Sequence, residues 1–282
     1  MAQKKKTNDK YDKLQYIAII IVSILLIAAV LFTLKSIDNQ RRNSYGGLSG
    51  NDGEFPLSSY DSGKYFIDNY YFRGYDDDNY TYKRGIDVSE HQGEIDWPSV
   101  KESGVEFAFI RAGFRSSDKG IMKEDVRFKE NIQGALDNDI QVGVYFFSQA
   151  ITVDEAIDEA VFTINLVKDY DVTLPIAYDM EEVSRFKDRI AWLNKSEVTE
   201  ISDAFCTVVE NYGYDSLIYA NPSWISSKLE LSKLTERKIW LAHYTGSTPF
   251  EYKYEIWQYN DSGSVDGIYG KVDLNIMYVE KQ

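Results

Sequence analysis

The chain has 282 residues, which is enough for one large domain with additional segments or for two small domains. Its net charge of −14 is unevenly distributed, because residues 1–34 carry five lysines and two aspartates, a sum of +3 that leaves −17 for the remainder. A remainder this acidic argues against nucleic acid as a partner. The chain has one cysteine, which excludes an intrachain disulfide. It has two histidines and no HExxH or CxxC motif, which argues against a metal site.

The first predicted element is a transmembrane helix at residues 14–34. Two polar residues alone interrupt the apolar run from Ile17 to Leu34, which approaches the ~20 residues that a helix needs to cross a bilayer. A cleaved signal peptide usually has a shorter apolar core, roughly 7–15 residues, and a small-residue cleavage site, which does not follow Leu34. Five lysines precede the span, so the positive-inside rule predicts a single-pass protein of the cell membrane, with residues 1–13 in the cytoplasm and the rest outside.

Residues 35–82 are predicted to form an extracellular linker. Its first half contains NSYGGLSGNDGE, which has the composition of a linker, whereas seven tyrosines and two phenylalanines lie between Tyr60 and Tyr82. Disordered spacers are usually poor in aromatic residues. The Tyr-rich half therefore either docks on the domain that follows or is an adhesive linker, and the sequence favours neither.

Strand and helix patterns alternate through residues 83–282, the predicted catalytic domain. Apolar runs suited to buried strands occupy residues 85–89, 105–113, 140–148, 174–180, 216–221, 238–244, 254–259 and 274–279. Helical patterns occupy residues 97–103, 125–138, 152–168, 196–212 and 222–229, and Cys206 is expected to pack inside the fourth of them. Thr152 and Ser196 are the expected helix caps. This alternation predicts an α/β fold with a parallel sheet, closed into a small barrel whose last third has lost its helices.

Polar side chains gather where these strands end, and barrels of this kind place their chemistry at that rim. The polar residues at the strand ends are Asp87, Arg111, Tyr145, Ser148, Asp179, Glu181, Tyr219, Asn221, His243, Tyr244 and Gln258, and Asp273 lies just before the eighth strand. One polar residue after a strand is usually part of a solvated loop. The whole set indicates a candidate site.

The segment PIAYDMEE, residues 175–182, ends a buried strand on three acids. Residues two apart in a strand share a face, so Asp179 and Glu181 are expected to point the same way, with Glu182 off that face and solvated. Two carboxyl groups held close cannot both ionise at low cost, and the one whose pKa rises can act as a general acid. Paired carboxylates with this division of roles are typical of glycoside hydrolysis.

Eight segments carry a family resemblance. They appear in the order RGIDVSEHQGEIDW (84–97), FAFIRAGF (107–114), GVYFFSQA (143–150), PIAYDMEE (175–182), IYANPSW (218–224), IWLAHY (239–244), EIWQY (255–259) and VDLNIMY (272–278). Together they resemble glycoside hydrolase family 25, the N-acetylmuramidases or lysozymes of bacterial wall turnover and phage lysis. The resemblance covers residues 83–282, and eight motifs in register make it specific.

The resemblance implies a modified TIM-like (β/α)5(β)3 barrel, preceded here by the predicted transmembrane helix, and hydrolysis of the β-1,4 bond from N-acetylmuramic acid to N-acetylglucosamine in peptidoglycan. Glu181 matches the family's general acid, Asp179 its D-x-E partner and Asp87 the acid of the first motif, so these three are the expected catalytic residues. The expected substrate-binding residues are Asp273 of the final D-x-N motif, Tyr145, Tyr219 and Gln258 by the resemblance, and Arg111 and His243 by their places at strand ends. We expect no cofactor and no metal.

Three routes of hydrolysis stay open at this point. Carbons two apart on a strand lie ~6.5–7 Å from each other, which straddles the carboxyl separations of retaining and inverting enzymes. In the third route, which we favour, the substrate's own acetamido oxygen attacks while Asp179 orients it. The rival to an enzyme tethered to the bilayer by residues 14–34 is an inactive glycan-binding scaffold of an envelope complex. Inactive relatives usually lose the acid, whereas this chain keeps Glu181.

Overall fold

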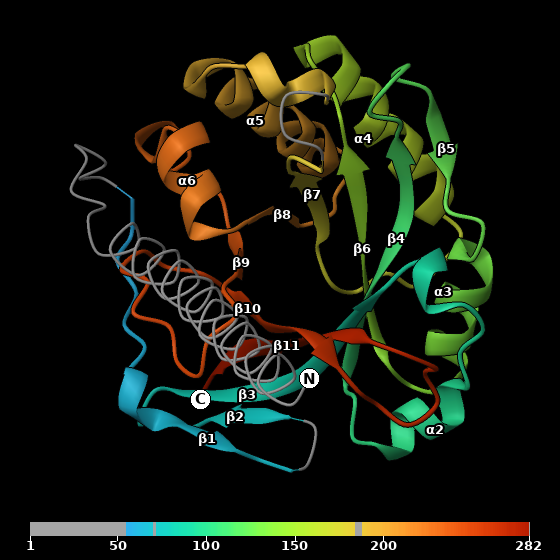
Figure 1. The fold of residues 1–282 in the computed structure, drawn as a ribbon, viewed down its shortest axis with the longest axis vertical. Coiled ribbons are helices and arrows are strands. Elements are labelled where there is room, and N and C mark those ends of the chain that lie inside the picture. Colours follow the sequence, from blue (N-terminus) through green and yellow to red (C-terminus); the bar gives the residue numbers. More distant parts are fainter. Residues whose placement is uncertain (1–54, 70–71, 184–187, 282) are drawn as a thin grey trace, which may run out of the picture. The chain divides into compact units, whose positions relative to one another are not determined.

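Eight strands close into a barrel in the computed structural model, which describes residues 55–69, 72–183 and 188–281 (Figure 1). In spatial order the strands are β3 (Tyr80–Val88), β11 (Val272–Glu280), β10 (Ile256–Gly263), β9 (Ile239–Ala242), β8 (Ser216–Ala220), β7 (Ile176–Met180), β6 (Gln141–Ser148) and β4 (Phe107–Arg115). Pairing of β3 with β4 closes the ring, and the short β5 (Met122–Glu124) extends the sheet beyond β4. All eight predicted strands are confirmed.

The barrel is mixed rather than parallel throughout. Strand β11 runs antiparallel to both β10 and β3, while the other neighbouring pairs of the barrel are parallel. The prediction of a parallel sheet is therefore wrong for this strand. The physical reason is the connection: residues 264–271 are too few for a crossover, which needs about a dozen residues or more.

Five α-helices follow the first five barrel strands, one after each, as predicted. They are α2 (Trp97–Glu102), α3 (Phe128–Asp137), α4 (Val153–Val167), α5 (Lys195–Asn211) and α6 (Pro222–Lys228). Short 3-10 turns lie at Ser62–Lys64, Glu90–Gln92, Arg189–Trp192 and Leu231–Lys233. The Thr152 hydroxyl accepts the N–H of Glu155 and caps α4 as expected. The α5 cap is Asn194, in a reciprocal pair with Glu197, so the prediction of Ser196 is wrong.

Alternate residues of the strands fill the barrel interior. The packed side chains are Phe107, Phe109, Ala177, Leu217, Tyr219, Trp240, Ala242 and Ile256. Glycine is required at one close approach, because a Cβ on Gly85 would lie 2.2 Å from the ring of Phe107. By the same alternation, the inward-facing residues that follow them lie at the carboxyl end of the barrel. There, polar side chains replace the apolar ones.

The Tyr-rich segment docks on the barrel. Its strands β1 (Tyr65–Ile67) and β2 (Arg73–Tyr75) form a separate antiparallel pair. The Trp257 ring is fully buried, and the ring of Tyr65 lies 4.9 Å from it. Tyr65 also shares a hydrogen bond of 2.7 Å with the hydroxyl of Tyr278. Ile256 and Gln258 point into the barrel, so Trp257 points out, and this segment covers it there.

The predicted transmembrane span at 14–34 and the first half of the predicted linker lie outside the described residues. Within residues 55–69, 72–183 and 188–281, no helix combines the length and apolarity needed to span a bilayer.

Candidate active site

A cavity of about 590 Å³ opens at the carboxyl ends of the parallel strands. Eight of the nine predicted site residues line it: Asp87, Arg111, Tyr145, Asp179, Glu181, Tyr219, Gln258 and Asp273. They come from seven different strands or from the residues that follow them, which the closed barrel brings to one rim.

His243 is the exception, and its placement is a correction to the sequence prediction. Trp240 and Ala242 face the barrel interior, so the alternation turns Tyr244 toward the cavity and His243 away from it. His243 is buried outside the cavity, with Nδ1 2.8 Å from the hydroxyl of Thr248. Burial lowers the pKa of His243. His243 therefore contacts the loop after β9 and does not line the cavity.

Asp87 is a buried carboxylate with two amide donors. Its Oδ2 accepts hydrogen bonds from Gln258 Nε2 and from Asn275 Nδ2, both at 2.8 Å. The Cα atoms of Asp87 and Asp273 are direct partners across β3 and β11, and their side chains share a hydrogen bond. Burial and the charge of Asp87 raise the pKa of Asp273 to about 9. The pair therefore holds one proton at neutral pH.

Asp179 and Glu181 both line the cavity, but their surroundings differ. Asp179 is buried at the end of β7, and its Oδ1 has no hydrogen-bond partner. Burial and the charges of Glu181 and Asp87 raise its pKa well above the usual range. Burial and Asp87 raise the pKa of Glu181 to about 7. Glu182 is exposed and does not line the cavity, as predicted from the strand faces.

Gln258 binds two tyrosines that line the cavity. Its Oε1 accepts from the hydroxyls of Tyr219 at 2.8 Å and Tyr244 at 2.9 Å, while its Nε2 donates to Asp87. The three bonds together fix the orientation of the amide. Tyr244 was among the polar residues at the predicted strand ends but not among the nine with a predicted role, although strand alternation from Trp240 was a signal that could have placed it at the cavity.

Arg111 lines the cavity but its guanidinium is already paired. Nε donates to Asp125 Oδ2 at 2.7 Å, and Nη2 donates to Glu90 Oε1 at 3.0 Å. The group also lies 5.3 Å from the ring centroid of Phe114. Arg111 therefore shapes one wall of the cavity. Its partners Glu90 and Asp125 carry no signal in the sequence that would have singled them out.

The lone cysteine lies far from this chemistry. Cys206 is buried on α5, and burial raises the pKa of its thiol to about 12, so it is a packing residue as expected. In the described part of the chain, no group of three or more His, Cys, Asp or Glu side chains is arranged to hold a metal ion.

The sequence profile of the glycosyl hydrolases family 25 matches residues 86–268, which run from β3 to the loop before β11. The chain belongs to glycosyl hydrolases family 25. The match covers the barrel from β3 to β10 and seven of the eight predicted residues that line the cavity, and Asp273 lies just beyond it.

Two similar proteins are named as lysozymes. The autolytic lysozyme of Clostridium acetobutylicum is 30% identical over 194 residues, which are 68% of this chain and 55% of that protein. Lysozyme M1 of Streptomyces globisporus is 29% identical over 201 residues, 68% of this chain and 66% of that protein. The family 25 chain thus spans little more than half the length of the first of them.

Solved structures share the fold. The modular autolysin LytC of Streptococcus pneumoniae, in complex with a synthetic peptidoglycan ligand, superposes with a TM-score of 0.64 and 26% identity over 80% of this chain and 52% of LytC. The lysozyme of Streptomyces coelicolor gives a TM-score of 0.55 and 26% identity over 69% of this chain and 91% of that chain.

Proposed function

We propose that this family 25 domain is a muramidase that hydrolyses the β-1,4 bond from N-acetylmuramic acid to N-acetylglucosamine in peptidoglycan. The observation that carries the proposal is Glu181, a carboxyl group with a pKa of about 7 at the rim of an acidic cavity. The names of two similar proteins, both lysozymes, and the peptidoglycan ligand of LytC support the substrate class.

Glu181 donates its proton to the glycosidic oxygen as the bond to the anomeric carbon breaks. A carboxyl group with this pKa is protonated in a large fraction of molecules at neutral pH, which a solvated glutamate is not. The leaving sugar takes the proton, and the carboxylate that remains acts as base on the water of the second step.

Asp179 assists through its unpartnered Oδ1. A buried carboxyl oxygen without a partner is costly, and the N–H of a bound acetamido group would satisfy it. That hydrogen bond would favour the ionised form of Asp179, against the burial that raises its pKa in the free protein. That contact would hold the acetamido oxygen against the anomeric carbon, where it attacks as the glycosidic bond breaks. We therefore favour the substrate-assisted route over direct attack by Asp179 or by water. A thiazoline mimic of the cyclic intermediate should then inhibit at concentrations well below those at which the reduced disaccharide does.

The decisive experiment is incubation of the full chain with purified peptidoglycan. New reducing ends on muramic acid support the muramidase. Sedimentation with peptidoglycan without release of reducing ends would instead indicate a glycan-binding scaffold.

We also propose that residues 14–34 cross the cell membrane once, with residues 1–13 in the cytoplasm and the family 25 domain outside. The apolar run and the five lysines before it support this topology. The lipid bilayer would then be the second partner of the protein, beside peptidoglycan.

A further inference from the structure

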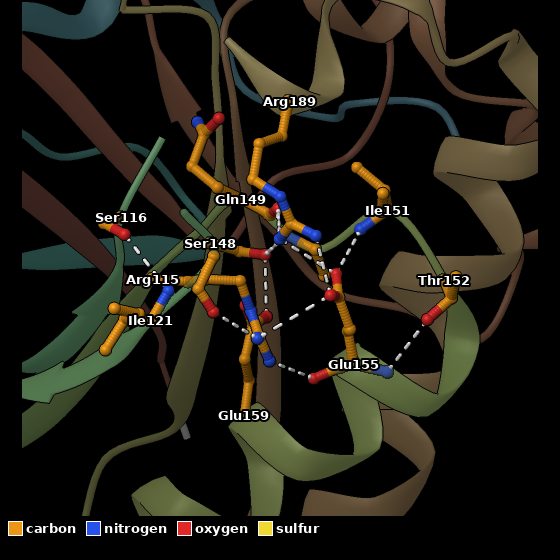
Figure 2. Close-up of polar contacts among 12 residues, drawn as sticks. Arg115, Ser116, Ile121, Ser148, Gln149, Ile151, Thr152, Glu155, Glu159 and Arg189 are labelled. Carbon is orange, nitrogen blue, oxygen red and sulfur yellow. Dashed lines mark hydrogen bonds and ion pairs between the residues drawn. The ribbon is translucent and has the colours of Figure 1, made fainter. Parts of the chain in front are cut away.

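A polar network lies next to the cavity, where the connection from β6 to α4 meets the chain that follows β7 (Figure 2). It contains two arginines and two glutamates, and none of these four has a part in the chemistry described above. Arg115 and Glu159 form its buried half, with Nε and Oε1 2.6 Å apart. Arg189, eight residues after Glu181 in the sequence, and Glu155 form the other half.

Arg189 is held by a two-pronged ion pair. Nη2 lies 2.7 Å from Glu155 Oε1, and Nη1 lies 3.0 Å from Glu155 Oε2. Nη1 also donates to the backbone oxygen of Gln149 at 2.9 Å (Figure 2). Burial alone would raise the pKa of Glu155, but hydrogen bonds from Arg189 and from the N–H of Ile151 hold it below its usual value. Glu155 is therefore charged at neutral pH.

The other face of the Arg189 guanidinium rests on a glycine. A Cβ on Gly120 would lie 2.5 Å from Nη1 of Arg189, and the φ of Gly120 is +65°, so both space and backbone favour glycine here. The carbonyl of Gly120 accepts from Arg115 Nη1 at 2.8 Å. Arg189 is thus confined between this loop, Glu155 and Gln149.

Gln149 connects this arginine to the catalytic acid. Its side chain is fully buried, and Nε2 donates to the backbone oxygen of Glu181 at 3.1 Å. Its Oε1 is buried and has no hydrogen-bond partner, so the amide is oriented by its bond to Glu181 at the cost of an unsatisfied acceptor. The ladder between β6 and β7 ends with Ser148 opposite Met180. Glu181 lies just beyond that ladder, and the Gln149 side chain takes the place of the next backbone bond.

We propose that Arg189 is a positioning residue for Glu181, acting through Gln149. Paired with Glu155, it fixes the backbone of Gln149, and the Gln149 side chain fixes the backbone of Glu181, so that the acid is held at the cavity. This inference rests on the proposed role of Glu181.

Displacing Glu181 would change its electrostatic surroundings. The groups that interact with it are Asp87 on β3, Asp179 on β7, Tyr219 on β8, Tyr244 after β9 and Asp273 on β11, and Glu182 and Lys228 line a smaller pocket on its other side. Burial is the main cause of its pKa of about 7. A Glu181 released toward solvent would therefore have a lower pKa and a smaller protonated fraction at neutral pH.

The test compares Arg189→Met and Gln149→Met with the control Arg237→Met in the full chain. Arg237 is matched to Arg189: it pairs with Asp203 and Glu210 at 2.7 and 2.6 Å, and its side chain is 12% exposed against 17% for Arg189. We expect kcat on peptidoglycan to fall about 10–100-fold in both test variants with KM nearly unchanged, because a small misplacement of a catalytic group has a cost of that order. Arg237→Met should keep wild-type kcat.

A carboxyl ¹³C titration of Glu181 gives a readout that does not depend on turnover. The pKa of Glu181 should fall in Arg189→Met and Gln149→Met and stay at the wild-type value in Arg237→Met. The double variant Arg189→Met with Gln149→Met should lose no more kcat than the worse single variant, since both act through one connection.

An unchanged Glu181 pKa in both test variants would overturn the inference, as would losses of kcat that multiply in the double variant. If Arg189→Met does not fold, Arg189→Lys replaces it, because a lysine keeps a charge beside Glu155 but cannot form the two-pronged pair and the bond to Gln149 together. A wild-type chain that cleaves no peptidoglycan would refute the proposed function, whereas the titration would still decide whether Arg189 positions Glu181.

Discussion

The ring of Tyr60 stacks on the ring of Tyr278, with centroids 3.8 Å apart and planes 14° apart. The Tyr60 hydroxyl donates to the backbone oxygen of Tyr254 at 2.9 Å. The first residue lies before the predicted catalytic domain, and the second lies on its last strand. The Tyr-rich segment is therefore part of the packed structure.

Removing this segment should destabilise the barrel. A fragment of residues 83–282 would expose the fully buried Trp257 and lose the half-buried Tyr60 and Tyr65. Full burial of one aromatic side chain contributes about 1.5–3 kcal/mol. Compared with residues 55–282, we expect a midpoint of thermal unfolding at least ~10 °C lower, or no folded protein at all. Red-shifted tryptophan fluorescence should accompany the loss. Equal midpoints for the two fragments would contradict the docking.

Glu181→Gln should lower kcat about 10²–10⁴-fold, because the amide keeps the shape of the side chain but has no proton to donate to the leaving oxygen. Binding to peptidoglycan should persist in a sedimentation assay. Asp179→Asn should also be severe. Glu182→Gln is the matched control, since Glu182 is exposed and outside the cavity, and it should stay within a few fold of wild type. A larger effect at Glu182 than at Glu181 would refute the assignment.

The pH dependence of kcat/KM should report the Glu181 proton. The acid must be protonated to act, and its pKa is about 7. Activity should therefore fall above about pH 7, approaching a tenfold loss for each further pH unit. The measurement is initial rate against pH at low substrate. A profile that stays flat to pH 9 would show that Glu181 is not the acid.

The stability of the fold should also depend on pH, in the direction set by the raised pKa of Asp273. Its folded pKa of about 9 exceeds its usual value of 3.8, so between these values the folded state binds more protons than the unfolded state. The stability that this group provides is complete below about pH 4 and is lost as pH rises toward 9. Asp273→Asn should therefore raise the unfolding midpoint, relative to wild type, more at pH 9 than at pH 5. The opposite trend in a thermal melt series would contradict the shared proton.

The proposed membrane anchor should confine peptidoglycan hydrolysis to a thin zone next to the membrane. Between residue 34 and Phe55, the first described residue, lie residues 35–54, and twenty residues span at most about 70 Å fully extended. The protein should sediment with membranes and be released by detergent rather than by salt. Replacing residues 1–34 with a cleavable signal should release it and extend cutting beyond that zone. A native chain that begins after residue 34 in the medium would show that the span is a signal peptide.

The barrel and most of its rim could be predicted because both depend on periodicity. Alternating strand and helix patterns gave eight strands and five helices, and residues such as Asp87 and Asp179 end strands in the sequence itself. Periodicity does not fix direction, so the antiparallel course of β11 was missed, although its short connection to β10 carried that information. His243 and Tyr244 were confused because the phase of alternation is ambiguous at a strand end.

The network of Glu155, Arg189 and Gln149 could not be predicted at all. Glu155 reads as an ordinary acid in the first turn of a helix, where it also favours the helix dipole. Its partner Arg189 comes from another segment, and charged pairs of this kind have no fixed spacing in a sequence.

The antiparallel pairing of β11 with β3 also determines where the chain enters and leaves the barrel. Glu280 is the register partner of Tyr80, and the backbone N–H of Lys281 donates to the oxygen of Asn79 at 2.8 Å, so the chain arrives at the barrel and leaves it at the same pole. Asp87 and Asp273, at the other ends of the same two strands, line the cavity. A module fused after Lys281 would therefore attach at the base of the barrel, at the pole opposite the cavity.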